Sequence, residues 1–141
     1  MISAAPEGSL LSVPLNVLIA DDDATTRALF AAFVRSMGYA VTAVANGREA
    51  WSVFETTEPQ LLIVDELSLG LAPVVAKELF RTLSEIRAHG VTVLLVEQNV
   101  QQSLRLADRA YVLESGKMVL DGPSGALLQN EDVRRAYLGE I

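Results

Sequence analysis

The stretch Pro59–Glu66, Pro-Gln-Leu-Leu-Ile-Val-Asp-Glu, decides the fold of this chain. Its apolar, branched residues follow a proline and a glutamine and end in two carboxylates. Such a short apolar run predicts a buried parallel strand that delivers Asp65 to the carboxyl edge of a sheet. Open α/β sheets bind their ligands at that edge, so Asp65 is the first candidate for a functional residue.

The composition of the 141 residues narrows the classes of function. Half of the residues are hydrophobic, which predicts a folded domain, and the absence of cysteine excludes a thiol nucleophile or a cysteine-ligated metal. The formal charge of −7 argues against nonspecific nucleic-acid binding. Residues 1–14 are expected to be a flexible leader without a convincing secretory signal, so the predicted location is cytoplasmic.

Apolar runs and helical spacings alternate along the rest of the chain. Strands are predicted at 16–20, 39–45, 59–66, 91–97, 109–114 and 117–121, and helices at 24–37, 48–57, 74–89, 99–108, 125–129 and 131–138. This alternation predicts a single α/β domain over 15–141, with three layers and a flavodoxin-like parallel sheet. The expected strand order is 2-1-3-4-5, with an added antiparallel edge strand after the Ser115-Gly116 turn and helices at the C-terminus.

Local signals refine these elements. Asp23 is a plausible N-cap for the first helix, and Asn46-Gly47 is predicted to form a turn. Several apolar side chains are expected to be buried. The set shared by one face of the first helix is Leu29, Phe30, Phe33, Val34 and Met37, and Ala50, Trp51 and Phe54 are expected to point inward from the second helix.

Acidic residues follow two of the predicted strands. The first strand ends in Asp21-Asp22-Asp23, and the third ends at Asp65. Crowded carboxylates favour a cation with all-oxygen ligation, for which Mg²⁺ is suited. Such an ion would also allow one carboxylate to attack a phosphoryl donor.

Residues 15–66 resemble the first half of a response-regulator receiver domain of the chemotaxis type. The resemblance is carried by Val-Leu-Ile-Ala-Asp-Asp-Asp at 17–23, by Ala-Asn-Gly-Arg-Glu-Ala at 45–50 and by the strand that ends at Asp65. It implies that Asp21, Asp22 and Asp65 hold Mg²⁺ and that Asp65 is the phosphoacceptor. The implied partner is a histidine kinase or phosphotransfer protein.

The receiver pattern changes after that strand. Receivers place a hydroxyl residue at the end of the fourth strand and a lysine at the end of the fifth, to contact the phosphate. Glu97 and Glu114 stand at these two switch positions if the strands align as predicted. Added negative charge opposes formation of an acyl phosphate, which predicts an impaired phosphoacceptor.

Residues 61–141 resemble the C-terminal part of an ABC-transporter ATPase of the branched-chain amino-acid type. The motifs are Leu-Leu-Ile-Val-Asp-Glu at 61–66, Val-Glu-Gln-Asn at 96–99 and Leu-Ala-Asp-Arg-Ala-Tyr-Val-Leu-Glu-Ser-Gly at 106–116. By this resemblance Asp65 and Glu66 are Walker-B-like, and Gln98 falls at the switch position that usually holds histidine. Residues 68–73 correspond to the loop that communicates with a second subunit.

This chain nevertheless lacks the phosphate-binding loop that ATP hydrolysis requires. A cradle of the form Gly-x-x-x-x-Gly-Lys-Ser/Thr is absent, as is a Leu-Ser-Gly-Gly signature. The lone Gly-Lys pair, Gly116-Lys117, is predicted to lie in a hairpin turn. The chain is therefore predicted not to be an enzyme.

Three functional interpretations follow from this chimera-like pattern of a receiver-like half, 15–66, and an ATPase-like half, 67–141. The first is a receiver-like signalling module with impaired phosphorylation at Asp65. The second is a hybrid or engineered scaffold without an evolved activity. The third and weakest is a vestigial ABC ATPase fragment. Apolar residues exposed in the second half would favour a homodimer.

Overall fold

The computed structural model describes residues 13–139, so most of the predicted leader, 1–14, lies outside the described residues. Strands and helices follow one another along these residues. The strands are β1 (Asn16–Asp21), β2 (Ala40–Val44), β3 (Leu61–Asp65), β4 (Thr92–Val96), β5 (Arg109–Glu114) and β6 (Lys117–Pro123). The helices are α1 (Ala24–Ser36), α2 (Gly47–Thr57), α3 (Pro73–Ala88), α4 (Val100–Leu106), α5 (Ser124–Gln129) and α6 (Glu131–Tyr137).

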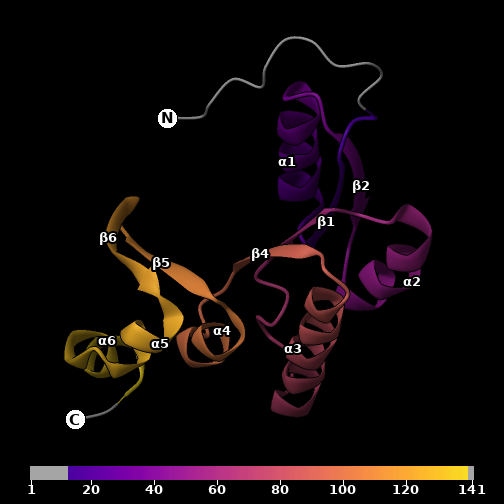
Figure 1. Ribbon diagram of the computed structural model, residues 1–141. Helices are drawn as coiled ribbons and strands as arrows, with labels where there is room; N and C mark the ends of the chain where they lie inside the picture. The colour runs from indigo at the N-terminus through magenta and orange to yellow at the C-terminus, as the bar shows by residue number, and fades with distance from the viewer. Residues whose placement is uncertain (1–12, 140–141) are drawn as a thin grey trace.

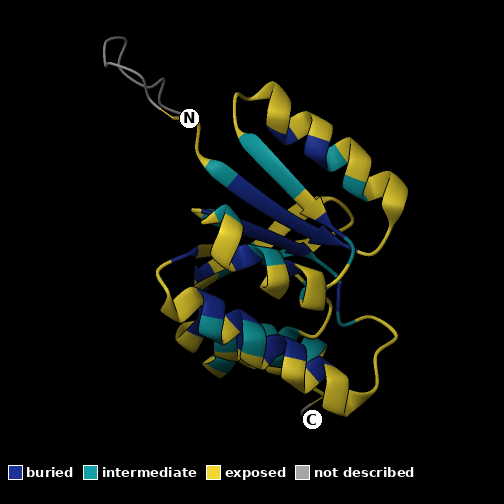
Figure 2. Cartoon of the chain, turned by 90° about the vertical axis from the view of Figure 1, so that its right-hand side faces the viewer, coloured by how far each residue is buried: buried dark blue, intermediate teal, exposed yellow. Residues whose placement is uncertain are grey.

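Four parallel strands form the main sheet in the order β2-β1-β3-β4. Helix α1 lies on one face of this sheet, and α2 and α3 lie on the other (Figure 1). The central strands are almost wholly buried, as the dark blue ribbons in Figure 2 show. Leu18, Leu62 and Val64 point toward α2 and α3, whereas Ile19 and Ile63 point toward α1. The predicted three-layer receiver-like arrangement is therefore confirmed for this part of the chain.

The predicted fifth position of the sheet is wrong. Strand β5 pairs only with β6, antiparallel, and these two strands form a separate sheet that stands apart from β4 (Figure 1). The pairing is local because Ser115 and Gly116 take positive φ angles of 48° and 75°, which close a tight turn. One face of the hairpin packs on a small core built around Leu104, Leu127 and Val133. We call α4, β5, β6, α5 and α6 together the hairpin unit.

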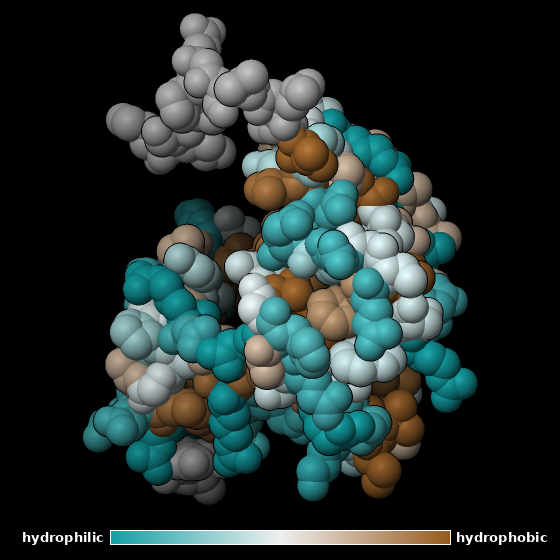
Figure 3. All heavy atoms as spheres, turned by 45° about the vertical axis from the view of Figure 1, so that its right-hand side comes forward, coloured by the Kyte–Doolittle hydropathy of each residue, from teal (hydrophilic) through white to brown (hydrophobic). Residues whose placement is uncertain are grey.

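Helix α1 buries fewer apolar residues than its spacing predicts. Ala31 and Val34 are buried against the sheet, and Phe30 packs on them, but Leu29, Phe33 and Met37 remain 69%, 60% and 51% exposed. The reason is that α1 covers its face of the sheet alone, so only one narrow side of the helix has anything to pack against. Hydrophobic residues lie among hydrophilic ones on the face of the molecule that Figure 3 shows.

Helix α2 begins one residue earlier than predicted. Asn46 is its N-cap and accepts a hydrogen bond from the Glu49 amide, so Asn46-Gly47 starts a helix instead of forming a free turn. Phe54 is buried as predicted, whereas Trp51 is 36% exposed and lines a groove described below. Among the described residues, none of the helices is long and apolar enough to cross a membrane.

Candidate functional site

Two aspartates meet at the carboxyl edge of the main sheet. β1 and β3 pair in parallel so that Asp21 lies directly beside Asp65. Asp22 follows Asp21 at the start of the next loop and is exposed, whereas Asp65 is partly buried. The sheet therefore sets Asp21 beside Asp65, because the first and third strands end at the same level, and Asp22 is the next residue after Asp21.

Asp21 is the buried member of this group, with 2% of its surface exposed. Its Oδ1 atom accepts a hydrogen bond from the Asp23 amide at 2.9 Å, but its Oδ2 atom is buried without a hydrogen-bond partner among the described residues. The guanidinium of Arg27 donates to the carbonyl oxygen of Asp21, at 2.8 Å, and not to its carboxylate. A buried carboxylate oxygen without a partner is costly, and a bound cation would remove that cost.

Asp23 has a different role from its two neighbours. Its carboxylate accepts a hydrogen bond from the Thr26 amide at 2.6 Å and caps α1, as predicted. This bond also lowers the pKa of Asp23. The cap directs the third carboxylate of the Asp-Asp-Asp run toward the helix, so Asp21 and Asp22 are the members of the run that remain to bind a ligand.

The pKa of Asp65 lies above its ordinary value. Partial burial is the first cause, and the negative charges of Asp21 and Glu66, then of Asp22 and Glu97, follow. All four of these charged neighbours are acidic. The charge balance around Asp65 is thus acidic, as expected of a site that binds a cation.

Glu97 and Gln98 connect the end of β4 to the loop after β3. The carboxylate of Glu97 accepts two hydrogen bonds from Ser68, at 3.0 Å from its amide and 2.6 Å from its hydroxyl. Gln98 donates to the carboxylate of Glu66 at 2.9 Å. Glu66 itself has a left-handed backbone with φ of 46°. The first predicted switch position, Glu97, therefore lies at the site, and its carboxylate is held by the loop.

Ser68 is the residue of this site that the sequence reasoning missed. The sequence places it only in a loop that follows the two acids of β3. A hydroxyl residue three positions after Asp65, in a chain whose fourth strand ends in a glutamate, was the available signal. Its partner became evident only from the parallel pairing of β3 with β4, which aligns Asp65 with Val96.

The second predicted switch position, Glu114, is wrong. Glu114 lies at the end of β5 in the hairpin unit, where it is hydrogen-bonded to the hydroxyl of Tyr137. It does not reach Asp65, because β5 is not a strand of the main sheet. The Gly116-Lys117 pair lies at the hairpin turn, as predicted, and forms no phosphate cradle.

The residues of the acidic edge fit a magnesium ion that keeps most of its water ligands. Across residues 13–139, no group of three or more acidic, histidine or cysteine side chains is assembled as a ready-made metal site. Mg²⁺ commonly binds through one or two carboxylates and several waters, however, and does not require an all-protein cage. The unpartnered oxygen of Asp21 and the raised pKa of Asp65 are the observations that favour such an ion.

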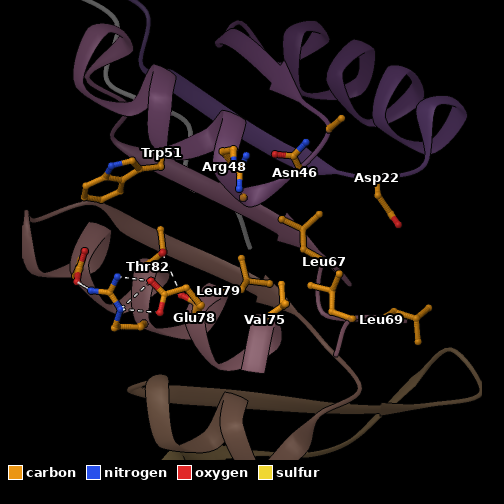
Figure 4. A pocket seen from close by; sticks show the side chains of 15 residues that line it. Asp22, Asn46, Arg48, Trp51, Leu67, Leu69, Val75, Glu78, Leu79 and Thr82 are labelled. Carbon is orange, nitrogen blue, oxygen red and sulfur yellow. Dashed lines mark hydrogen bonds and ion pairs between the residues drawn. The ribbon is translucent and has the colours of Figure 1, made fainter. Parts of the chain in front are cut away.

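A groove of about 810 Å³ opens beside the acidic edge, between α2 and α3. Its apolar lining comes from both helices and from the loop after β3, and Asp22 lies at one end (Figure 4). The helices approach closely at its base, where a side chain at Gly47 would come within 2.7 Å of Leu79. Trp51 and Arg48 lie on the α2 side of the groove, and Glu78 lies on the α3 side.

Comparison with known proteins finds two kinds of relative. The response regulator receiver domain family matches residues 17–107, which extends well past the predicted receiver-like half. The chain is also similar to BraG of Pseudomonas aeruginosa, a high-affinity branched-chain amino acid transport ATP-binding protein. The two are 54% identical over 83 residues, which is 59% of this chain and 36% of that protein. LivG of Escherichia coli, which carries the same description, is 39% identical over 85 residues, or 60% of this chain and 33% of that protein.

These matches overlap and are partial. The receiver match and the BraG match together exceed the length of the chain, so they share some of its residues. The chain spans about a third of the length of the curated relatives it matches. The family match and the BraG match confirm the resemblance to receiver domains and to branched-chain amino acid ABC ATPases.

Solved structures show the same double similarity at the level of the fold. A response regulator receiver protein from Pseudomonas putida matches with a TM-score of 0.56 and 17% identity, over 69% of this chain and 83% of that one. The structure of cbiO1 from Clostridium perfringens, part of an ABC transporter complex, matches with a TM-score of 0.52 and 24% identity, over 63% of this chain and 37% of that one.

Proposed function

The chain belongs to the response regulator receiver domain family, and from this membership we propose that it is a signalling module that accepts a phosphoryl group on Asp65 with low efficiency. The observation that carries the proposal is the register of β1 with β3, which sets Asp21 beside Asp65. In this proposal Asp21, Asp22 and Asp65 hold Mg²⁺. The phosphoryl donor is a histidine kinase or phosphotransfer protein, and the place of action is the cytoplasm.

The reaction is a transfer between two side chains. A carboxylate oxygen of Asp65 attacks the phosphorus of a phosphohistidine, an O–P bond forms, and the N–P bond breaks as the histidine nitrogen leaves and takes up a proton. When bound, Mg²⁺ supplies positive charge that screens the carboxylates from the incoming phosphoryl oxygens. The chain contributes the position of Asp65 at the strand end, and the unpartnered oxygen of Asp21 is the anchor for the ion.

The low efficiency follows from the charges that surround the acceptor. Glu66 and Glu97 both act on Asp65 electrostatically, and they would repel the oxygens of an acyl phosphate. The fifth-strand lysine implied by the receiver resemblance has no equivalent in this sheet, because β5 lies elsewhere. The phosphorylated product therefore lacks the switch hydroxyl at position 97 and the fifth-strand lysine that would stabilise it.

The test is the intact mass of the protein after incubation with Mg²⁺ and acetyl phosphate. We expect a small fraction of a single phosphoryl adduct, absent from Asp65→Asn and retained by Asp132→Asn, which changes an exposed acid on α6. An adduct that survives in Asp65→Asn would contradict the assignment of the acceptor. Absence of any adduct in folded protein would reject phosphorylation by this donor.

Variants at the end of β4 test the stated cause of the low efficiency. Glu97→Thr removes one repelling charge and supplies a hydroxyl, so labelling should accelerate by roughly tenfold, which corresponds to about 1.4 kcal/mol. Because Glu97→Thr also removes the acceptor of two hydrogen bonds from Ser68, the control is Ser68→Ala, which removes the hydroxyl bond and keeps the amide bond. It should leave the labelling rate near that of the parent. Equal acceleration in both variants would show that loop release, not charge, limits the reaction.

A hybrid scaffold without evolved activity is the second candidate. It is favoured by the separation of the hairpin unit from the main sheet, which is unlike the predicted five-stranded receiver sheet. A vestigial ATPase is a weaker candidate still, because this chain lacks a phosphate cradle and its Gly116-Lys117 pair lies in a turn. We propose that the chain does not hydrolyse ATP. Release of phosphate from ATP by the purified chain, lost in Glu66→Gln, would contradict this.

A further inference from the structure

The groove between α2 and α3 is lined by apolar side chains that remain open to solvent. Leu69, Leu71 and Val75 are 62%, 41% and 51% exposed, and Trp51 on the α2 side is 36% exposed. Single exposed apolar residues are ordinary, whereas a contiguous exposed apolar patch marks a surface that binds a partner. The groove is therefore a candidate docking site, and its apolar lining takes no part in the phosphorylation proposed above.

The shape of the groove suits an elongated ligand. Val75, Leu79 and Thr82 line it from α3 at spacings of four and three residues, so this helix turns one face toward α2 over about 10 Å. Trp51 and Asp22 lie at opposite ends of the groove (Figure 4). Because its leucines stay exposed, the groove is open, unlike the pockets that enclose small ligands. An amphipathic helix lays the apolar side chains of one face into such an open groove.

Acidic side chains surround the end of the groove at Asp22. Asp22 is exposed and follows Asp21, which pairs in register with Asp65. Glu66 and Glu97 also act electrostatically on Asp65. Complementary charge stabilises the approach of a partner, and like charge opposes it. A ligand that reaches this end of the groove is therefore expected to carry positive charge there.

The charges along the rest of the groove are nearly balanced. Arg81 pairs with both Glu78 and Glu85, which leaves one negative charge in this group. Arg48, on the α2 side, is exposed and has no ion pair among the described residues. The ligand therefore needs its positive charge at the Asp22 end, and the part that lies along the groove can be apolar.

We propose that this groove binds an amphipathic helix of a partner protein, whose apolar face contacts Trp51, Leu71 and Val75 and whose basic end lies over Asp22. The apolar contacts supply most of the affinity, because ion pairs with exposed carboxylates are weak. The positive charge selects the partner and sets the direction of the helix. Such binding requires neither a phosphoryl group nor Mg²⁺, so it does not rest on the function proposed for Asp65.

Trp51 reports on binding directly, because it is the single tryptophan of the chain and lies in the groove. The probe is a synthetic helix of about 15 residues with blocked termini, leucines along one face, lysines at one end and no tryptophan. We expect this leucine–lysine peptide to change the Trp51 emission of the native chain, saturably, at micromolar concentration.

Two further peptides separate the apolar face from the charge. One has the same residues in scrambled order and no apolar face, and the other has glutamates in place of the lysines. Each should bind weaker by about tenfold or more. Equal binding of either control peptide, or no saturable change with the leucine–lysine peptide, overturns the proposal.

Two neighbouring valines of α3 provide matched variants of the protein. Val75 lines the groove, whereas Val74 is 80% exposed and lies outside the lining. A glutamate is favourable in the first turn of a helix, so both Val75→Glu and Val74→Glu should fold. Val75→Glu should weaken binding of the leucine–lysine peptide by about tenfold or more, because it places a charge beneath the apolar face. Val74→Glu should bind as tightly as the native chain or slightly more tightly.

The two variants also distinguish a defined site from general attraction to an acidic chain. General attraction would make both variants bind the basic peptide more tightly, because each adds a negative charge, and this result rejects the groove. Asp22→Asn should weaken binding about threefold, and Asp132→Asn on α6 should leave it unchanged. Equal binding by these two variants rejects the placement of the basic end.

A second copy of the chain is the other occupant that the experiment can detect. Trp51 emission is therefore followed without peptide over a range of protein concentrations, and we expect it to stay constant. A concentration-dependent emission that Val75→Glu abolishes would assign the groove to a second copy and overturn the proposal.

Discussion

The main sheet and the hairpin unit use strands of similar composition but pair them in opposite ways. In the main sheet each strand finds a parallel neighbour across an intervening helix, and buried residues fill both faces. In the hairpin unit β5 pairs with the next strand across the two-residue Ser115-Gly116 turn, and a small separate core covers one face. In this chain β5 thus pairs with the next strand in the sequence and not with β4.

The largest effect should come from the centre of the main sheet. Leu62 is fully buried on β3, the strand that lies between β1 and β4. Leu62→Ala should therefore lower the free energy of unfolding by about 3 kcal/mol. Urea unfolding followed by the fluorescence of Trp51, the single tryptophan, measures this loss. The control Leu69→Ala changes a leucine that is 62% exposed and should cost less than about 0.5 kcal/mol. Equal losses in the two variants would mean that β3 is not the centre of the core.

The same substitution in the hairpin unit should have a more restricted effect. Leu127 is buried in the small core, and Leu127→Ala should destabilise this unit by about 2 kcal/mol. Circular dichroism should then report a loss of structure at a lower urea concentration. The free energy of unfolding measured by Trp51 fluorescence should change by less than about 0.5 kcal/mol. If both signals shift together, the two regions unfold as one cooperative unit and the distinction between them is only topological.

Magnesium should act on the main sheet alone. If Asp21 and Asp65 hold the ion, Mg²⁺ at tenfold above its dissociation constant should stabilise the Trp51 transition by about 1.4 kcal/mol. Asp21→Asn should abolish this increment, and Asp132→Asn on α6 should preserve it. An equal increment in both variants would indicate diffuse screening of the acidic chain, not a site.

The smallest effect should appear in the pH dependence of stability. Because the native state raises the pKa of Asp65 above 3.8, its contribution favours folding below that pH and is lost as the pH rises through the native pKa. Asp65→Asn should therefore match the parent at low pH and become more stable than the parent at neutral pH. The gain should stay below about 1 kcal/mol, since Asp65 is only partly buried.

Thermal unfolding of the two proteins across pH, without Mg²⁺, measures this difference. The hairpin unit offers the matched control. Asp108→Asn removes a mostly exposed carboxylate that pairs with Arg87, so it should be neutral or slightly destabilising at neutral pH. A stabilised Asp108→Asn would attribute the effect to the overall negative charge of the chain.

The elements of the main sheet could be predicted from sequence because each carries its own signal. Branched apolar runs end in aspartates at Asp21 and Asp65, and Asp23 and Asn99 cap the helices that follow their strands. The convergence of the acids follows from these signals, because the carboxyl ends of neighbouring parallel strands lie at one edge of the sheet.

The membership of β5 in the sheet could not be predicted in the same way. Residues 109–114 read as a strand in either arrangement, and periodicity carries no information about which edge a strand joins. The prediction of which residues of α1 are buried was partly wrong for a related reason. Spacing shows that Leu29 and Phe33 share a side of α1, but burial requires a neighbour that the chain does not place there. Likewise, Asn46 favours a turn and a helix cap equally, and only the start of α2 decides between them.

The separate sheet of β5 also limits how the chain could be altered to restore a complete receiver site. No point substitution in the hairpin unit can bring a lysine to Asp65, because no strand of that unit ends at the acidic edge. A cation must come from the loops after β1 to β4, and position 97 already acts on Asp65. The connection of β5 to a separate sheet, and not the choice of any single residue, therefore limits the repair of the phosphate contacts. Directed evolution of single residues should yield improved variants at Glu97 and in the Glu66–Ser68 loop before any in the last thirty residues.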